Sequence, residues 1–367
     1  MKVFYSAYTC KGNTGDILIN KLQIEEYARY AEVYVDCAGM PIDFYNTIFD
    51  TKNPNIKDFV KIYGVNYRSR NVFHVLRLLK KEHFTHFTKS PGPYAYIKLP
   101  IKTFLIRLTG AFCYWIAYMY GIRVIALGID LGYSLEPKWL QIINNLYFSI
   151  YHQIGTRSLN NEQKLTKSLT NVTYIPDMAF LYPISKERIP NHRKGRVALS
   201  FRNVDDNNML IEKLKTICNF FSEKNFGIEI IHQVEEDKDN STRLFQVVKN
   251  ECVHMVEPLI DYYSLDVYKK YDFVISNRLH VLLMAAMNGA IPYALISQNV
   301  KENKIIDVFS SVFESHLVSY IKDFELDIFN SIYNRQEILK NEINNCVRAQ
   351  QSLCVNYISN MFEKTKK

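Results

Sequence analysis

An arginine and a histidine lie two residues apart in the segment Asn277-Arg278-Leu279-His280. Residues 272–276 have the pattern of a buried strand, and the apolar run after the segment has the length and spacing of a helix. In an open α/β sheet, ligands bind beyond the carboxyl ends of the strands, beside helix N-termini. An arginine there could hold an acid group, and an imidazole could move a proton. The segment is therefore a candidate active site, although a sheet-edge arginine and a core histidine would give the same pattern.

Strand and helix patterns alternate along both halves of the chain, as they do in proteins with a mostly parallel sheet. In the first half, strands are predicted at residues 2–8, 31–38, 83–89, 123–128, 151–156 and 172–175. In the second half, strands are predicted at 196–201, 228–232, 253–256, 272–276 and 291–296, and helices at 207–224, 242–250 and 279–288. The pattern from residue 327 onward is helical. We therefore predict an α/β fold of two Rossmann-like domains with a helical C-terminus.

The polar, basic segment 184–195 indicates a linker between an N-terminal domain of residues 1–183 and a C-terminal domain of residues 196–367. The seven cysteines are scattered and form no Cys-x-x-Cys pair, which argues against a disulfide framework or a zinc site and favours a reducing cytoplasm. The net charge of +8 favours anionic small molecules or an anionic membrane surface as partners. No nucleic-acid-binding module is recognisable.

Residues 108–122 are almost wholly apolar but fall short of the roughly 20 residues that cross a bilayer. We expect a buried helix there. The surrounding segment 97–120 is rich in aromatic residues and contains Lys98, Lys102 and Arg107, so contact with the inner face of the plasma membrane stays open as an alternative. The chain turns polar by Thr9, too early for the apolar region of a secretion signal.

Loops at other predicted strand ends also carry residues that could bind a ligand. In Gly12-Asn13-Thr14-Gly15-Asp16, two glycines allow a tight turn and Asp16 could cap the helix that follows. This loop is neither a dinucleotide fingerprint nor a P-loop, so an ordinary turn is the alternative. The corresponding segments elsewhere are Ser90-Pro91-Gly92-Pro93, Gly128-Ile129-Asp130-Leu131-Gly132, Thr156-Arg157-Ser158, Pro176-Asp177, Phe201-Arg202-Asn203, His232-Gln233 and residues 297–301.

In their order along the chain, these segments resemble the polysaccharide pyruvyl transferase family over nearly the full length. The segment 128–132 is similar to the glycine-rich loop of that family, Thr156-Arg157-Ser158 to its arginine-serine turn, and residues 176–180 to its proline-aspartate segment. Two positions depart from the family pattern. Residues 90–93 stand where the family has a run of glycines, and Gln298 stands where it has a tyrosine before the lysine that matches Lys301.

The resemblance implies a GT-B-like fold and the transfer of pyruvate from phosphoenolpyruvate to a hexose of a cell-surface polysaccharide or its lipid-linked precursor, as a cyclic ketal. Protonation of the donor alkene needs an acid of near-neutral pKa, and His280 suits that role. Arg157 and Arg278 would pair with the carboxylate and phosphate of the donor, beside Ser297 and Lys301. The residues expected to bind the acceptor are Asn13, Asp16, Ser90, Gly92, His232 and Gln233. No metal or cofactor is expected, with phosphoenolpyruvate acting as co-substrate.

Two other functions fit parts of the same pattern. A nucleotide-sugar glycosyltransferase of the same overall fold often carries a glutamate that holds the donor ribose. The comparable position in this chain is Met284, which cannot accept two ribose hydrogen bonds. An inactive sugar-binding subunit of a polysaccharide-assembly complex is harder to reconcile with the presence of Arg157, Arg278 and His280.

Overall fold

A computed structural model describes residues 1–9, 12–67, 72–93, 100–131, 138–184, 195–204, 208–297, 300–313 and 315–366. The chain forms two compact units. The first comprises Met1–Lys11, Asp16–Leu181 and Leu353–Lys367, and the second comprises Gly12–Gly15 and Tyr182–Ser352. These bounds differ from the predicted 1–183 and 196–367 in two short pieces, since Gly12–Gly15 group with the second unit and Leu353–Lys367 with the first. Most of the predicted linker lies outside the described residues.

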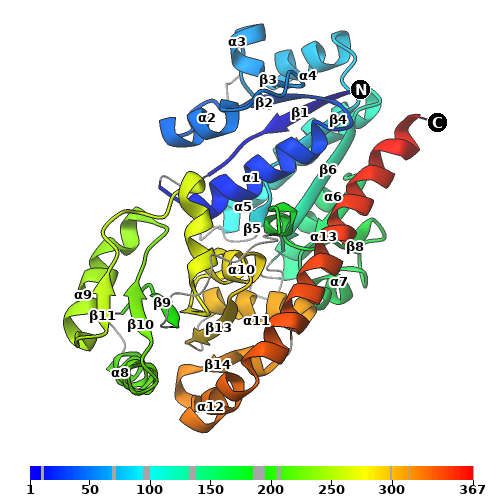
Figure 1. Ribbon diagram of the computed structural model, residues 1–367. Coiled ribbons are helices and arrows are strands. Elements are labelled where there is room, and N and C mark those ends of the chain that lie inside the picture. Colours follow the sequence, from blue (N-terminus) through cyan, green and yellow to red (C-terminus); the bar gives the residue numbers. More distant parts are fainter. Residues whose placement is uncertain are drawn as a thin grey trace. The chain divides into compact units, whose positions relative to one another are not determined.

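The first unit is built on a parallel sheet (Figure 1) with the strand order β3-β2-β1-β4-β6-β7-β8. The short strand β5 pairs with β6. The strands are β1 (Lys2–Ser6), β2 (Glu32–Asp36), β3 (Ile56–Asp58), β4 (His86–Lys89), β5 (Gly92–Pro93), β6 (Arg123–Asp130), β7 (Gln153–Thr156) and β8 (Val172–Tyr174). The helices are α1 (Thr14–Tyr27), α2 (Ile42–Phe49), α3 (Phe59–Tyr63), α4 (Val72–Lys81), α5 (Pro100–Met119), α6 (Lys138–Ser149) and α7 (Leu159–Leu165).

Helices cover both faces of this sheet. Phe4 of β1 packs in a core cluster with residues of α3, α4, α5 and α6. The next residue, Tyr5, points the other way and donates hydrogen bonds to Asn20 (2.8 Å) and Gln23 (3.0 Å) of α1. Because the strands are buried on both faces, they appear in the sequence as continuous apolar runs.

The second unit has a parallel sheet of order β11-β10-β9-β12-β13-β14. Its strands are β9 (Arg196–Ser200), β10 (Gly227–Ile230), β11 (Val253–Met255), β12 (Phe273–Ser276), β13 (Ile291–Ile296) and β14 (Val318–Tyr320). Its helices are α8 (Asn208–Glu223), α9 (Lys238–Val248), α10 (Leu279–Met287), α11 (Val300–Val312), α12 (Leu326–Asn334) and the start of α13 (Gln336–Lys366). The strand order reverses between β9 and β12, which is where doubly wound sheets bind their ligands.

The strand predicted at residues 123–128 extends further, to Asp130. A register shift between Ala126 and Ile129 lies in its pairing with β7. Gly128 lies in this stretch with a φ of 66°, a conformation that favours glycine. Asp130 is the last residue of this strand, where sequence alone indicated a glycine-rich loop.

The apolar segment predicted as a buried helix is buried on one side only. On α5, Tyr114 and Ala117 are fully buried in the core, whereas Phe112 and Trp115 are about half exposed. The prediction was wrong for that outer side, because the helix is apolar all round and only one face meets the sheet. No helix that the structure describes is both long enough and apolar enough to span a bilayer.

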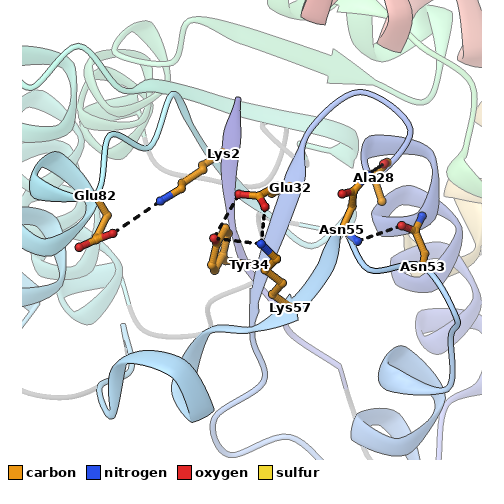
Figure 2. A network of polar contacts seen from close by, with 8 residues as sticks. All are labelled: Lys2, Ala28, Glu32, Tyr34, Asn53, Asn55, Lys57 and Glu82. Carbon is orange, nitrogen blue, oxygen red and sulfur yellow. Dashed lines mark hydrogen bonds and ion pairs between the residues drawn. The ribbon is translucent and has the colours of Figure 1, made fainter.

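Charged side chains form a network at the amino ends of β1, β2 and β3. Figure 2 shows Lys57 in contact with Glu32, while the hydroxyl of Tyr34 donates to Glu32 at 3.2 Å and Lys2 pairs with Glu82 at 3.5 Å. The hydrogen bond from Lys57 lowers the pKa of Glu32 below its usual value. The charged side chains at this edge of the sheet therefore pair with one another. The candidate site residues lie at the other edge, after the carboxyl ends of the strands.

His86 in β4 is fully buried, and we expect it to make the protein less stable as the pH falls. Its ring packs edge-on against Phe362, with 5.2 Å between ring centroids. Burial, followed by the charge of Arg123, lowers the pKa of His86 from 6.5 to about 3. Because the unfolded chain takes up the proton first, the stability present above about pH 6.5 is lost progressively as the pH falls toward 3.

Between pH 7 and pH 5, this single group is expected to lower the free energy of unfolding by about 2 kcal/mol. Urea unfolding at the two pH values measures the loss. The matched variant is His86→Gln, whose side chain does not titrate and whose stability should depend less on pH by that amount. An equal pH dependence in both proteins would contradict the prediction.

Candidate active site

The carboxyl ends of β9 and β12 are tied together by short polar contacts. Ser276 donates through Oγ to the carbonyl of Ser200. Asn277 accepts from the backbone N–H of Arg202 at 3.0 Å and donates to its carbonyl at 3.1 Å. The backbone N–H of Arg278 donates to Ser276 Oγ at 2.9 Å. These contacts fix the backbone from which Arg278 and, after it, α10 project.

The guanidinium of Arg278 forms an ion pair with Asp237. Asp237 is 4% exposed and ends the short helix Glu235–Asp237 that follows β10. The buried Nε–H of Arg278 has no hydrogen-bond acceptor among the described residues. The carboxylate therefore orients the guanidinium and leaves one donor that an anionic ligand could use.

The segment Gly12–Gly15, which includes the first two residues of α1, joins this same neighbourhood. Asn13 forms an isolated β-bridge with Val234, and the N–H of Thr14 donates to the carbonyl of Gln233 at 3.4 Å. Gly15 packs directly on the imidazole of His280: a Cβ atom added at Gly15 would lie 2.2 Å from His280 Nδ1. The glycine-containing loop, the segment after β10 and the Arg-Leu-His segment thus meet within the second unit.

His232 and Gln233 are both buried, with 1% and 4% exposed. Burial lowers the pKa of His232, so the ring is neutral at physiological pH. Its Nδ1 has no hydrogen-bond partner among the described residues. The predicted contact of these two residues with an acceptor sugar stays a prediction.

Gly15→Ala is expected to reduce the activity of the site by about tenfold to a hundredfold, because the new methyl group must displace the His280 ring or the loop and small misplacements of catalytic groups cost this much. The measurement is kcat beside the thermal midpoint. Gly227→Ala is the matched control, since a Cβ at Gly227 has no neighbour within 4 Å. Similar kcat values for the two variants would argue against the contact.

In the first unit, Arg157 is almost fully buried, at 2% exposed. Its guanidinium pairs with Asp177 at 2.8 Å and with Asp130 at 3.6 Å. The Nε–H of Arg157 has no acceptor among the described residues. A Cβ at Gly128 would lie 2.9 Å from the side chain of Met178, next to Asp177 in the chain. Three predicted segments therefore converge at the ends of β6, β7 and β8.

Three predicted acceptor residues lie elsewhere in this unit. Ser90 accepts from the N–H of Tyr8 and donates to Asn20, both at 2.6 Å, so it links the ends of β1 and β4 to α1. Asp16 lies in the first turn of α1, where its carbonyl accepts from Asn20 at 2.8 Å. Gly92 has a φ of 126° in β5, which favours glycine. The two hydrogen bonds of Ser90 give it a structural role in this unit, and its predicted contact with an acceptor stays a prediction.

The remaining predicted donor residues follow β13. Ser297 is half-buried directly after the strand. Lys301 lies in the first turn of α11, but its side chain and the neighbouring Gln298 lie outside what the structure describes. Within the described part of the chain, no group of three or more His, Cys, Asp and Glu side chains is arranged to hold a metal ion.

Sequence reasoning missed the carboxylates that hold the two arginines. Asp130 and Asp177 were predicted in strand-end loops, and Asp237 follows a predicted strand, but none was assigned to an arginine. The sequence feature that could have indicated these ion pairs is an acidic residue at the end of a strand near the one that precedes the arginine. The contact of Gly15 with His280 was also missed.

A family model described as polysaccharide pyruvyl transferase matches residues 13–295. The chain belongs to this family. The match begins within the Gly12–Gly15 loop and includes Arg157, Arg278 and His280, so the segments that converge within each unit are part of the family region. No curated protein is similar enough in sequence to count as a match.

Solved structures resemble this pyruvyl transferase family member in fold. A glycosyltransferase from Rickettsia africae aligns with a TM-score of 0.64 at 10% identity, covering 100% of this chain and 98% of the other. UDP-GlcNAc 2-epimerase from Neisseria meningitidis aligns with a TM-score of 0.61 at 12% identity, covering 99% and 100%. MurG from Acinetobacter baumannii aligns at 0.52 and 12% identity, covering 98% and 99%. The predicted GT-B-like α/β fold is confirmed.

Proposed function

We propose that this protein transfers the pyruvyl group of phosphoenolpyruvate to two hydroxyls of one hexose in a cell-surface polysaccharide or its lipid-linked precursor. The family match over residues 13–295 supports a transferase that modifies polysaccharide. The observation that carries the finer proposal is the convergence of Gly15, His280 and Arg278 within one unit. It supports the proposal because it brings the proposed proton donor, the guanidinium proposed to bind an anion and a segment of small residues to the carboxyl edge of one sheet.

The reaction needs one proton donor and two attacks on the same carbon. A proton from the His280 imidazolium adds to C3 of the donor, which leaves a cation at C2 that the first sugar hydroxyl attacks with loss of its proton. The bond from C2 to the phosphate oxygen then breaks, its electron pair leaves with the phosphate, and the second hydroxyl attacks the same carbon. The products are the cyclic ketal and inorganic phosphate. One hydroxyl proton restores His280, and the other leaves with the phosphate.

Arg278 is proposed to bind the phosphate or carboxylate of the donor through its Nε–H, which has no acceptor among the described residues. Arg157 is the second proposed donor-binding group, and its Nε–H is the donor without an acceptor among the described residues. Ser297 and Lys301 keep their proposed places beside the donor. The residues proposed to bind the acceptor remain Asn13, Asp16, Ser90, Gly92, His232 and Gln233. The proposed location is the cytoplasm.

The experiment that tests this function compares ligands by thermal stabilisation, because a ligand that binds only the folded state raises its stability. We expect phosphoenolpyruvate to raise the unfolding temperature and a panel of UDP-sugars to leave it unchanged. Arg278→Lys keeps the charge and loses the planar fork, so it should fold normally and respond less to phosphoenolpyruvate. Ketal formation is then measured as phosphate release that depends on an added saccharide.

A UDP-sugar-dependent transferase is the second candidate, because the Neisseria epimerase of similar fold is bound to UDP-GlcNAc. Met284, at the position where many such enzymes carry a ribose-binding glutamate, is fully buried in α10 and offers no carboxylate. Stabilisation by a UDP-sugar without stabilisation by phosphoenolpyruvate would replace the first proposal with this one.

A further inference from the structure

The outer side of α5 carries a continuous stripe of exposed apolar side chains. With spacings of three and four residues, they lie on one face of the helix. The residues of this apolar stripe are Ile101, Leu105, Leu108, Phe112, Trp115 and Met119. Ile101 is 75% exposed, and Phe112 and Trp115 are 51% and 50% exposed. At 1.5 Å per residue the stripe is about 27 Å long.

The neighbouring helices widen this surface. Phe73 of α4 is exposed and contacts Phe112 edge-on, with 6.0 Å between ring centroids. Phe112 stacks on Trp115 at 6.2 Å. Ile142 and Leu146 are exposed on α6, which packs against α5. More than half of the exposed large apolar side chains in the described part of the chain lie on these three helices, a concentration that marks an interaction surface.

The charged residues in the sequences of these three helices are all basic. The sequences of α4, α5 and α6 contain six lysines and arginines and no aspartate or glutamate. On α4, Arg77 and Lys80 are exposed on the same face as Phe73. Arg107 is the exception, since it is buried with its guanidinium over the rings of Tyr147 and Phe148. The exposed cations described on this surface are therefore those of α4.

We propose that this surface docks on a membrane whose surface contains anionic lipids, with the apolar stripe lying in the interface between headgroups and acyl chains. An amphipathic arrangement of apolar and basic residues without acidic ones is what such a surface binds. The indole of Trp115 is a side chain that prefers this interface. A second copy of the chain is the poorer occupant, because it would bring the same uncompensated positive charge to the contact.

Vesicle co-sedimentation tests the docking without any substrate, so its failure is distinct from a failure of the proposed reaction. We expect the full chain to bind vesicles of phosphatidylcholine containing about one third phosphatidylglycerol, to bind pure phosphatidylcholine more weakly, and to be released by salt. In a Trp139→Phe background, Trp115 is the one remaining tryptophan, and its emission should shift to the blue on binding.

The double variant Phe112→Ser with Trp115→Ser is expected to bind anionic vesicles at least about tenfold more weakly. Its unfolding temperature should fall only slightly, because both side chains are half exposed. Arg77→Gln and Lys80→Gln should each weaken binding about fivefold. Ile42→Ser is the matched control: Ile42 is 72% exposed on α2 of the same unit, outside the three helices, and its loss should leave binding unchanged.

Either of two results would overturn the proposal: the absence of binding to anionic vesicles, or binding that the double variant retains in full. If no vesicle binding is seen and analytical ultracentrifugation shows a concentration-dependent dimer that the double variant loses, a second copy of the chain is the occupant.

Discussion

Replacing His280 with asparagine is expected to lower the rate of ketal formation by about 10²- to 10⁴-fold, while the affinity for phosphoenolpyruvate changes little. The asparagine amide cannot donate a proton to the donor alkene, and the loss of a positioned general acid has effects of this size. Gly15 packs against Nδ1 of the ring, so the smaller side chain fits without a clash. The measurements are kcat from phosphate release and donor affinity from thermal stabilisation.

The matched control is His254→Asn. His254 is an exposed histidine on β11 of the same unit, so the substitution should leave both quantities unchanged. A His280→Asn protein with normal kcat would remove the acid assignment. If the variant lost donor affinity in proportion to its activity, the role of His280 would be donor binding and not proton transfer.

Arg157→Met is expected to destabilise the folded protein by about 3 to 5 kcal/mol, because it leaves the buried carboxylates without their counter-charge. Asp177 is 1% exposed, and Asp130 also faces the guanidinium. Urea unfolding measures the loss. Adding Asp177→Asn to Arg157→Met should recover part of it, since one of the two uncompensated charges is then removed.

The matched control for this prediction is Arg335→Met. Arg335 pairs with Glu342 at 3.9 Å, and the two side chains are 47% and 41% exposed, so its removal should cost no more than about 1 kcal/mol. An Arg157→Met protein as stable as this control would mean that the buried ion pairs do not hold the loop ends together. Donor binding by Arg157 would then need to be tested apart from folding.

The strands of both sheets were predictable because each lies as an apolar run between polar turn residues, which is how strands buried on both faces appear. β3 and β5 were not predicted, because their sequences, Ile-Lys-Asp and Gly-Pro, contain no apolar run. β14 was not predicted either. The outer side of α5 was mispredicted for a different reason. Composition shows that a helix is apolar but does not show which of its faces the sheet covers.

The ion pairs of the candidate site could not be derived from the sequence, because they depend on the order of the strands. Asp130, Arg157 and Asp177 lie at or after the ends of β6, β7 and β8, and these strands are neighbours in the sheet. Arg278 meets Asp237 through the loops that follow β12 and β10. The sequence places each residue at a strand end, whereas the sheet topology decides which strand ends lie side by side.

Helix α13 is one continuous element, yet Gln336–Ser352 group with one unit and the residues from Leu353 onward group with the other. In the first unit, Phe362 packs against Tyr27 and Tyr30 of the segment around α1 (centroids 5.4 and 5.6 Å). Chimeras that exchange the N-terminal and C-terminal halves between family members should therefore carry the C-terminal tail together with the N-terminal half. A single crossover point near residue 184 would pair the N-terminal half with a C-terminal tail from the other protein, including the residue at position 362 that packs on Tyr27 and Tyr30.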